Sequence, residues 1–531
     1  MPQETALKKA TWGVALASIL VGAAVAPVQA APKAPKVPKA PVAAPAGYLN
    51  PDLARLAVRD PGRDVDVIAQ LHPGVSAGKL QAGLESVGVE VTRQLPIINA
   101  LVVRLDARLV GALAAAPGIR AVTPDGGVQT SGIQVDTKKL VPKYAPAARA
   151  SGQWGTWTGK GIGVAVVDSG ISDHKDFADR AGGTRVAASV VANPGATSAK
   201  DTVGHGTHVA GIIGGDGAQR RDALASRYVG VAPEVDLVSI KVDDAEGGAT
   251  VSDVIAGVQF AVTYRQQYNI RVLNLSLNSD VAQPYDVDPL NAAAEVAWFK
   301  GIVVVAAAGN RGTAADAVNY APANDPYVIT VGATDDKATD GTKDDVLAAF
   351  SSRGRTQDGF AKPEVTASGS RIVSTLAAGS DFARECPSCV VDGEYLRIGG
   401  TSMATAVVSG VVANLLQAKP TWTPNQVKGA LVNTAAGTVR QVDQPTAMAA
   451  TGTKLVSNQG LTPNDAIDPA TGDIKAGVDS TRSSWSTATG GLSADWTRSS
   501  WSCGECTGTG ITTDFTRSSW SRSSWSAAVG R

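Results

Sequence analysis

One serine in the sequence occupies a position in which a hydroxyl could act as a nucleophile. Ser402 follows two glycines and a threonine, and it begins a helical pattern that extends toward Gln417. The first turn of a helix has free backbone N–H groups and the positive end of the helix dipole, which both suit a developing oxyanion. A lone serine at such a place is more often a helix cap, so a catalytic role requires a base and a carboxylate elsewhere in the chain.

Two other segments supply that base and that carboxylate. His205 opens an apolar, helix-like run, and its glycine neighbours leave the imidazole accessible. Asp168 follows an apolar strand pattern, where a charge without a partner would be costly, although a turn Asp at a strand end is the alternative. Asn310 ends another apolar strand and is either a turn residue or an oxyanion donor. Hydroxyl, imidazole and carboxylate together predict nucleophilic hydrolysis by a serine.

The elements that must position these residues follow one pattern along residues 145–445. Apolar runs of strand length alternate with helical stretches, which predicts an α/β fold of three layers, a parallel sheet buried on both faces. In such sheets the active site lies at the carboxyl ends of the strands. The predicted strands span residues 162–167, 237–242, 272–277, 302–308 and 327–331.

The four segments occur in the order Asp168, His205, Asn310 and Ser402, and together they resemble the subtilisin-like (subtilase) serine peptidases. The likeness covers residues 152–434, and several motifs match in a fixed order, which a single short motif could not do. The resemblance implies a serine endopeptidase with the three-layer subtilisin-like fold. The further motifs are GVAPEVDLVSIKV from Gly230, LNLSL from Leu273, FSSRG from Phe350 and KPEV from Lys362.

The resemblance also implies a role for each site residue. Ser402 would be the nucleophile, His205 the general base and then the general acid, and Asp168 the group that orients the imidazole. Asn310 would join the Ser402 backbone N–H in the oxyanion hole, and His208 would be structural. This mechanism requires no cofactor. Structural calcium is common in the family, but no segment predicts its ligands.

By the same resemblance, Leu275, Ser276 and Leu277 form one wall of the substrate cleft, where an extended protein or peptide substrate would pair as an added strand. Asn278 stands where the family usually has glycine, at the edge of the primary pocket. We therefore expect that pocket to be narrower or more polar than the common broad, apolar one.

The N-terminus predicts export. Residues 1–30 combine a basic start, an apolar run of about fifteen residues and a small-residue cleavage site, which is typical of a signal peptide. A membrane anchor is the alternative, but a spanning helix needs roughly 20 residues. We expect a secreted, extracellular protein with no membrane span in its mature form. Residues 31–46 contain only Ala, Pro, Lys and Val, which predicts an extended linker.

Residues 60–128 predict a small α+β domain. The pattern of strand, helix, strand, strand, helix, strand is the split βαβ order of a ferredoxin-like domain. By resemblance this domain is the inhibitory pro-segment of a zymogen, an intramolecular partner whose tail would pass through the active-site cleft. Maturation would then cut between Asp125 and Tyr144. The predicted elements span residues 65–71, 76–86, 89–94, 100–105, 107–115 and 119–123.

The C-terminal region, residues 446–531, is rich in Thr, Gly, Ser and Asp and contains three copies of TRSSWS and one further RSSWS. This composition predicts a poorly ordered extension. The alternative is a surface module whose exposed tryptophans stack on sugars, peptides or the body of the protein.

Four cysteines form two close pairs, Cys386 with Cys389 and Cys503 with Cys506. Disulfides are the default in an exported protein, and the sequence leaves all three connectivities open. Zinc is the alternative, but the pairs are too far apart for the usual spacing. The two histidines of the HGTH stretch likewise lack the spacing of a zinc helix, so we predict no metal site.

Composition and site chemistry limit the competing functions. Lys and Arg number 48, as do Asp and Glu, so no charge excess draws the chain to nucleic acid. The main alternative is a catalytically inactive secreted subtilase scaffold that presents the Trp-rich tail for binding, and the complete triad argues against it. An esterase or a peptide ligase would use the same triad.

Overall fold

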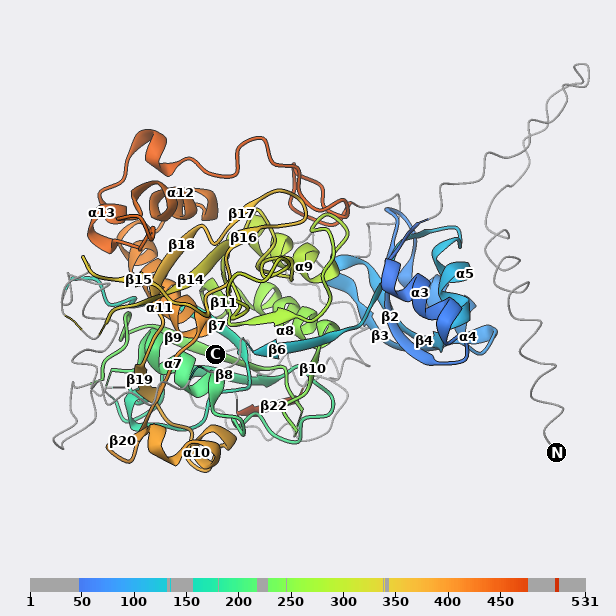
Figure 1. Cartoon of the computed structure of the whole chain (residues 1–531). Coiled ribbons are helices and arrows are strands. Elements are labelled where there is room, and N and C mark those ends of the chain that lie inside the picture. Colours follow the sequence, from blue (N-terminus) through green and yellow to red (C-terminus); the bar gives the residue numbers. More distant parts are fainter. Residues whose placement is uncertain are drawn as a thin grey trace, which may run out of the picture. The chain divides into compact units, whose positions relative to one another are not determined.

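A computed structural model describes the chain as two compact units that divide between Gly126 and Gly127 (Figure 1). The predicted signal peptide and linker lie outside the described residues, and so does most of the region in which maturation is expected. The described residues are 47–130, 134, 156–179, 181–216, 228–244, 246–337, 339 and 343–475, together with the backbone of 502–505.

The first unit has the predicted ferredoxin-like order of elements. Its strands lie side by side as β1-β5-β2-β4-β3, and β5, β2, β4 and β3 are antiparallel to one another along this row. Leucines of the two helices, among them Leu80 and Leu113, pack with strand residues such as Val67 in one apolar core. The elements are β2 Asp64–Leu71, α4 Ala77–Ser86, β3 Glu90–Leu95, β4 Ala100–Asp106, α5 Val110–Ala114 and β5 Ile119–Pro124.

This unit begins before residue 60, where the sequence analysis placed its start. A two-residue strand, β1 (Tyr48–Leu49), pairs in parallel with β5 and is followed by the helix α3 (Pro51–Arg59). The Asn50 side chain caps α3 by accepting hydrogen bonds from the first N–H groups of the helix, and Leu53 enters the core. The sequence analysis made no prediction for residues 51–59 and so missed α3, in which Leu53 is the one fully buried residue.

The second unit is built around one large, mostly parallel sheet. The strands β14-β13-β11-β7-β9-β8 are parallel, β15 and β22 pair antiparallel at its two ends, and β18 also pairs with β14. Every residue of β7 and β13 is buried, as expected for apolar strands covered on both faces. The strands are β7 Gly163–Asp168, β8 Val186–Val191, β9 Asp236–Lys241, β11 Ile270–Leu275, β13 Val303–Ala307, β14 Ile329–Asp335, β15 Val346–Leu347, β18 Val365–Ser368 and β22 Ser502–Glu505.

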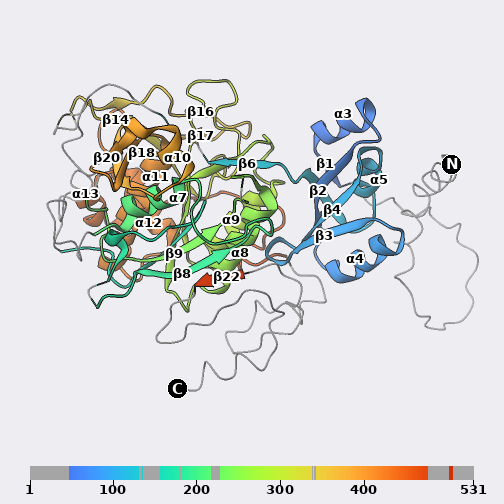
Figure 2. The same ribbon diagram turned by 90° about the horizontal axis from the view of Figure 1, so that it is seen from below.

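Helices form the outer layers, so the predicted three-layer α/β fold is confirmed (Figures 1 and 2). On one face α7 (His205–Gly214) packs against α11 (Thr401–Ala418), and on the other α8 (Val251–Thr263) packs against α9 (Pro289–Phe299). Within the described residues, α11 is long and apolar enough to cross a membrane, but 89% of the relevant stretch is buried inside the protein, as in a core helix.

The ordered body continues beyond residue 445, which corrects the predicted start of the tail at residue 446. After α12 (Pro424–Thr434) and α13 (Gln444–Met448), an irregular segment remains part of the second unit as far as Asp473. Asn464 is fully buried, and its N–H donates to Glu295 Oε2 at 2.8 Å. Polar contacts of Asn464 and the burial of Ile467 hold this irregular segment, which has no regular hydrophobic period that the sequence analysis could detect.

Most of the predicted tail lies outside the described residues. Beyond residue 475 the structure describes the backbone of β22, which pairs antiparallel with β8 at the edge of the large sheet. The choice between a poorly ordered extension and a tryptophan-bearing binding module therefore stays a prediction.

Candidate active site

The strand order of the large sheet reverses between β7 and β11. From β7 the chain continues to β8 and β9 on one side of β7, and then to β11 and β13 on the other. In open α/β sheets the carboxyl ends of the strands at such a point form a crevice. Asp168 is the last residue of β7, Ser276 follows β11, and Asn310 lies three residues after β13. The fold therefore brings these predicted residues to one edge of the sheet.

A buried ion pair occupies this edge. His205, the first residue of α7, has its Nδ1 2.7 Å from Oδ1 of Asp168, and both side chains are fully excluded from solvent. Gly204 precedes it with a φ of 101°, a left-handed conformation that glycine adopts readily. Burial is the largest influence on the pKa of His205 and lowers it, but the charge and hydrogen bond of Asp168 reverse this and raise the pKa above 6.5.

A second carboxylate, which the sequence analysis did not identify, holds the start of α7. Asp201 accepts hydrogen bonds from the N–H groups of Gly204 (2.6 Å) and Thr207 (2.8 Å), and from the Ser169 hydroxyl (2.8 Å). Ser169 also donates its N–H to Asp168 at 2.8 Å. Burial raises the pKa of Asp201, although these bonds oppose the shift. The available signal was an Asp shortly before an apolar helix, a common helix cap.

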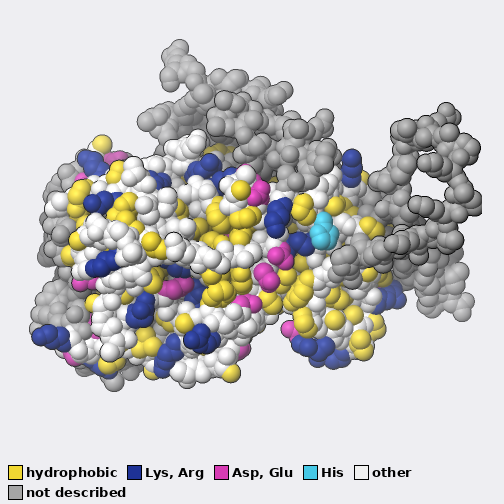
Figure 3. Space-filling view, turned by 90° about the horizontal axis from the view of Figure 1, so that it is seen from above, with side chains coloured by type: hydrophobic (Ala, Val, Ile, Leu, Met, Phe, Trp, Pro, Cys, Tyr) yellow, Lys and Arg dark blue, Asp and Glu magenta, His cyan; other side chains and the backbone are white. Residues whose placement is uncertain are grey.

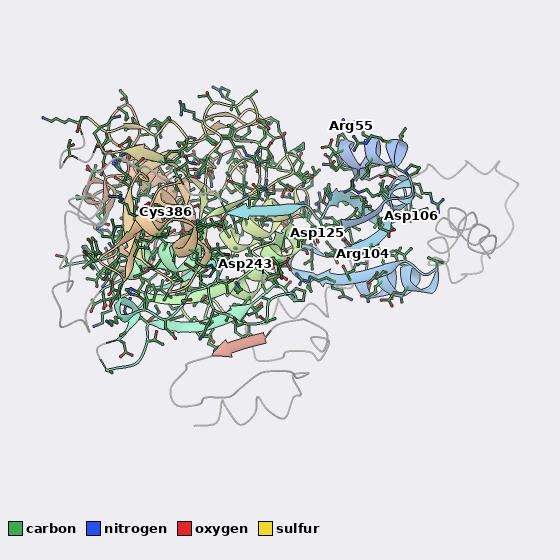
Figure 4. The ribbon with its side chains drawn as sticks, turned by 60° about the horizontal axis from the view of Figure 1, so that its bottom comes forward. Arg55, Arg104, Asp106, Asp125, Asp243 and Cys386 are labelled. Atoms are coloured by element: carbon green, nitrogen blue, oxygen red, sulfur yellow. A yellow bond between two sulfur atoms is a disulfide. The ribbon has the colours of Figure 1, made fainter. Side chains whose placement is uncertain are left out.

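One buried cation lies among these carboxylates. Lys241, the last residue of β9, donates from Nζ to the carbonyl of Ser169 at 3.0 Å and to Asp243 at 2.6 Å. Burial raises the pKa of Asp243, labelled in Figure 4, to about 6 despite the opposing effect of Lys241. Asp243 and Asp201 both help to raise the pKa of His205. The imidazole is thus surrounded by groups that favour its charged form.

Ser402 lies in the first turn of α11, as predicted, and is buried. Its hydroxyl donates to the carbonyl of Ser276 at 3.1 Å, and the Ser276 hydroxyl donates to the carbonyl of Ser402 at the same distance. Nε2 of His205 is buried without a hydrogen-bond partner in the described structure. A serine-to-histidine hydrogen bond therefore requires the Ser402 hydroxyl to leave the Ser276 carbonyl, and catalytic hydrogen bonds often tighten only when substrate binds.

Asn310 is tied to the start of the same helix. Its Oδ1 accepts hydrogen bonds from the N–H (3.0 Å) and the hydroxyl (3.1 Å) of Thr401, the residue before Ser402. The Thr401 hydroxyl also accepts from the N–H of Gly309 at 3.1 Å. Because these contacts engage the carboxamide oxygen, Nδ2 is the end that can donate to an oxyanion beside the N–H groups of α11.

An extended segment lies along the predicted cleft wall. β6 is the central strand of a three-stranded antiparallel sheet, between β10 and β12. Farther along the chain, the backbone of Gln134 exchanges two hydrogen bonds with Gly399, at 2.8 and 3.0 Å. The chain after the first unit thus pairs with β12 and then with the segment that leads to Ser402. The bounds are β6 Gly127–Thr130, β10 Ala249–Thr250 and β12 Leu277–Ser279.

The four residues predicted to form the substrate cleft have different surroundings. Leu277 and Asn278 pair with β6, and Ser276 contacts Ser402. Leu275 instead lies inside the large sheet, where β11 pairs with β7 and β13, so it is a core residue. The change of direction after β11 causes this split, because it moves the following residues from the large sheet to the small one.

The Asn278 side chain extends from β12 to the end of β13. Its Nδ2 donates to the carbonyl of Ala307 at 3.0 Å, and the side chain is buried. Its Oδ1 lies close to Gly309: a Cβ added at Gly309 would be 3.0 Å from Asn278 Oδ1. The amide therefore occupies space between the strand that pairs with β6 and the strand that leads to Asn310. The expectation of a narrower, more polar pocket stays a prediction.

Cys386 and Cys389 form a disulfide, which excludes the two connectivities between pairs (Figure 4). The side chain of Cys503 and all of Cys506 lie outside the described residues. In the part of the chain that the structure describes, no three His, Cys, Asp or Glu side chains gather as a metal site. Structural calcium stays a prediction.

Comparison with known proteins places this chain among the subtilases. The model of the subtilase family matches residues 159–464. Serine protease AprX of Bacillus subtilis (strain 168) is 39% identical over 284 residues, which are 52% of this chain and 62% of AprX. M-protease of Shouchella clausii (strain KSM-K16) is 34% identical over 353 residues, which are 66% of this chain and 78% of M-protease.

A solved structure is also similar. Fervidolysin from Fervidobacterium pennivorans, described as a keratinolytic enzyme related to subtilisin, superposes with a TM-score of 0.56 and 25% sequence identity. The superposition covers 73% of this chain and 61% of the fervidolysin chain. The similarity therefore extends from the sequence motifs to the fold.

Proposed function

The chain belongs to the subtilase family of subtilisin-like serine peptidases, and we propose that it is an endopeptidase in which Ser402, His205 and Asp168 hydrolyse peptide bonds. The observation that carries this proposal is the solvent-excluded pair of His205 and Asp168 at the edge of the sheet where the helix of Ser402 begins. Nε2 of His205 lacks a hydrogen-bond partner among the described residues. A base with that nitrogen available can take the proton of a hydroxyl.

In the proposed first step, the Ser402 hydroxyl gives its proton to Nε2 of His205 while Oγ attacks the substrate carbonyl carbon. Asp168 accepts the Nδ1–H and so selects the tautomer whose Nε2 can accept. Asn310 Nδ2 and the Ser402 N–H donate to the oxyanion. His205 then protonates the leaving amine, the C–N bond breaks and an acyl-enzyme forms. A water molecule repeats the sequence, which releases the acid and regenerates Ser402.

We propose protein or peptide chains in extended form as the substrates. The pairing of β6 between β10 and β12 supports this, because main-chain hydrogen bonds of an added strand give affinity for any extended peptide. Basic and acidic side chains are interspersed on the face shown in Figure 3, which fits no nucleic-acid partner. The chemistry proposed here uses no cofactor.

The chain is further proposed to be an exported precursor, with residues 1–30 as the signal peptide and the first unit as the pro-segment. β6 follows directly after the first unit, and Gln134 pairs with Gly399 three residues before Ser402. These contacts support a cut by the enzyme's own site between Asp125 and Tyr144. Release of the cut segment would open β12 to other substrates.

The test is Ser402→Ala in the full chain, with the exposed Ser388→Ala as the matched control. We expect Ser402→Ala to fold, to lose peptide hydrolysis, to stay at precursor length and to resist labelling by a fluorophosphonate. The control should be processed, active and labelled once per chain. Normal trimming and retained peptidase activity in purified Ser402→Ala would refute the assignment of the nucleophile.

A further inference from the structure

An aromatic side chain outside the proposed triad lies against the imidazole. Phe382 belongs to the short helix α10 (Asp381–Glu385), and its ring centroid is 6.2 Å from that of His205 with the ring planes at 88°. This is an edge-to-face contact of ordinary length. Phe382 is half-buried, so its ring contacts the imidazole and also retains exposed surface.

Backbone hydrogen bonds of α10 fix the position of the Phe382 ring. The N–H groups of Asp381 and Phe382 donate to the carbonyls of Thr202 and Val203 at 2.9 and 3.0 Å. The next residue, Gly204, lies close to the Ser380 hydroxyl. A Cβ added at Gly204 would be 2.6 Å from the Ser380 Oγ. α10 is therefore docked on the three residues that precede His205 (Figures 1 and 2 show α10 beside α7).

The direction of β6 indicates on which side of the substrate cleft Phe382 lies. β6 pairs with β12 first, and the chain then reaches Gln134, which pairs with Gly399. A substrate lying in the same direction would therefore have the half that follows the scissile bond, the leaving half, near Gly399. Gly399 directly follows β21 (Tyr395–Ile398), and α10 lies in the connection between β19 (Ile372–Thr375) and β21. The loop of Phe382 thus belongs to the hairpin that leads into the leaving side.

We propose that Phe382 is a substrate-binding residue that contacts the side chain immediately after the scissile bond and favours an apolar residue there. The proposal rests on the proposed function, since it concerns the same cleft. A substrate side chain would bury apolar surface against the exposed part of Phe382. This contact would lie next to His205, the proton donor for the leaving amine. The disulfide between Cys386 and Cys389 closes the turn directly after α10 and limits the freedom of this loop.

A purely structural role, in which Phe382 only holds the imidazole, predicts a different result. The two roles are separated by two substrates that share one acyl half. In the first, leucine follows the scissile bond; in the second, a methylamide, the leaving group is methylamine, which is too small to reach a side-chain pocket. A binding role affects the first substrate, whereas support of His205 affects both.

The experiment measures kcat/KM of mature wild-type, Phe382→Ala and Phe382→Leu enzymes on both substrates, with the half-buried Phe360→Ala as the matched control. We expect Phe382→Ala to lose about tenfold on the leucine peptide, the scale of an apolar pocket contact, and less than twofold on the methylamide. Phe382→Leu, which keeps an apolar side chain, should retain most of the preference even where the alanine variant folds poorly.

Equal losses on both substrates, or no loss on either, would overturn the proposal. A wild-type enzyme that hydrolyses neither substrate would instead contradict the proposed function itself. Peptides with glycine and leucine after the scissile bond complete the test, because the preference for leucine should disappear in Phe382→Ala and remain in Phe360→Ala.

Discussion

Two of the clusters of buried charge in the second unit differ in the kind of atom that they leave without a hydrogen-bond partner. The first, the His205 cluster, lies at the crevice and leaves Nε2 of the imidazole of His205 and Oδ2 of Asp168 without partners in the described structure. The second, the Lys362 cluster, lies around α12 and β18 and leaves only carboxylate oxygens, Glu295 Oε1 and Asp325 Oδ2, without partners in the same described structure. The His205 cluster comprises Asp168, Asp201, His205, Lys241 and Asp243; the Lys362 cluster comprises Glu295, Asp325, Lys362, Glu364 and Lys428.

The cations of the Lys362 cluster are fully engaged. Lys362 donates to Thr330 Oγ1 (2.9 Å) and to Glu364 (2.6 Å), and Lys428 donates to Glu364 (3.0 Å). Lys428 also donates to three successive backbone carbonyls, from Pro326 to Val328. Burial lowers the pKa of Lys362 to about 8 even though Glu364 opposes the shift. Both ammonium groups thus hold backbone in place, since Lys362 also donates to the carbonyl of Asp325 at 2.5 Å.

Buried charge alone therefore does not identify an active site. Perturbed pKa values occur in both clusters, since burial and neighbouring charges act wherever ions are removed from water. What distinguishes the His205 cluster is an imidazole nitrogen that lacks a partner and lies at the edge where strand order reverses. We therefore expect substitutions in the first cluster to change turnover and those in the second to change stability.

The largest effect is expected for Asp168→Asn. The amide cannot hold the imidazole in the tautomer whose Nε2 accepts a proton, so kcat/KM should fall on the order of 10⁴-fold. Exposed Asp173→Asn is the matched control and should keep wild-type activity. Steady-state kinetics on one peptide measures the loss, and urea unfolding checks the fold. A loss of kcat/KM below tenfold in Asp168→Asn would contradict the expectation that the His205 cluster, unlike the Lys362 cluster, determines turnover.

A large effect on stability, with no effect on turnover, is expected for Lys362→Met. Removing one partner of a buried ion pair should lower the free energy of unfolding by about 3 kcal/mol, the low end for such a change, because Glu364 loses one of its two cations and keeps Lys428. Turnover per folded molecule should stay unchanged. Chemical denaturation with active-site titration measures both quantities, and the exposed Lys160→Met is the control. Loss of turnover at full stability would contradict the separation of roles.

A smaller loss is expected for Asn464→Ala, which tests the segment beyond the predicted boundary. The Asn464 side chain donates to the carbonyls of Tyr285 (2.8 Å) and Asp288 (3.1 Å). Leaving these buried acceptors unpaired should cost about 1–3 kcal/mol in the free energy of unfolding. Thermal denaturation measures the shift. Truncation after residue 475, which removes β22 and keeps this segment, is the comparison, and truncation after residue 450 should lower Tm further.

The smallest effect is a shift in pH dependence. His205 must be neutral to accept a proton, so activity should fall as pH decreases through its raised pKa, with the midpoint above 6.5. Asp201 contributes to that raised pKa, and Asp201→Asn should therefore move the midpoint of kcat/KM to lower pH. A pH profile on a substrate without ionisable groups measures this. A midpoint that moves upward would mean that Asp201 acts on His205 in another way.

Hydrophobic periodicity in the sequence predicted the strands and helices that depend on residues close together in the chain. The first unit matches its predicted strands and helices to within a few residues, because each of its hairpins and helices has a clear apolar period. The residues Asp168, His205 and Ser402 could be chosen because each lies at the end of an apolar strand or at the start of a helix. Parallel strands then bring these positions together without further information from the sequence.

The parts that sequence reasoning missed depend on contacts between distant residues. Asp201 is a loop residue whose role arises from three donors that folding places around it. Phe382 approaches His205 from a point 177 residues farther along the chain. Asn464 is buried through bonds to Glu295, Tyr285 and Asp288, and no period in its own segment marks that burial. Such residues are defined by their partners and not by their neighbours in sequence.

The pairing of β6 with β12 has a kinetic consequence, because both strands belong to one molecule. A covalently linked segment acts on its partner as though it were present at a fixed effective concentration, of the order of millimolar for short flexible links. A free peptide must exceed that concentration to displace β6. A cut made by the enzyme on its own chain would also be first order, with a half-time that does not change when the precursor is diluted.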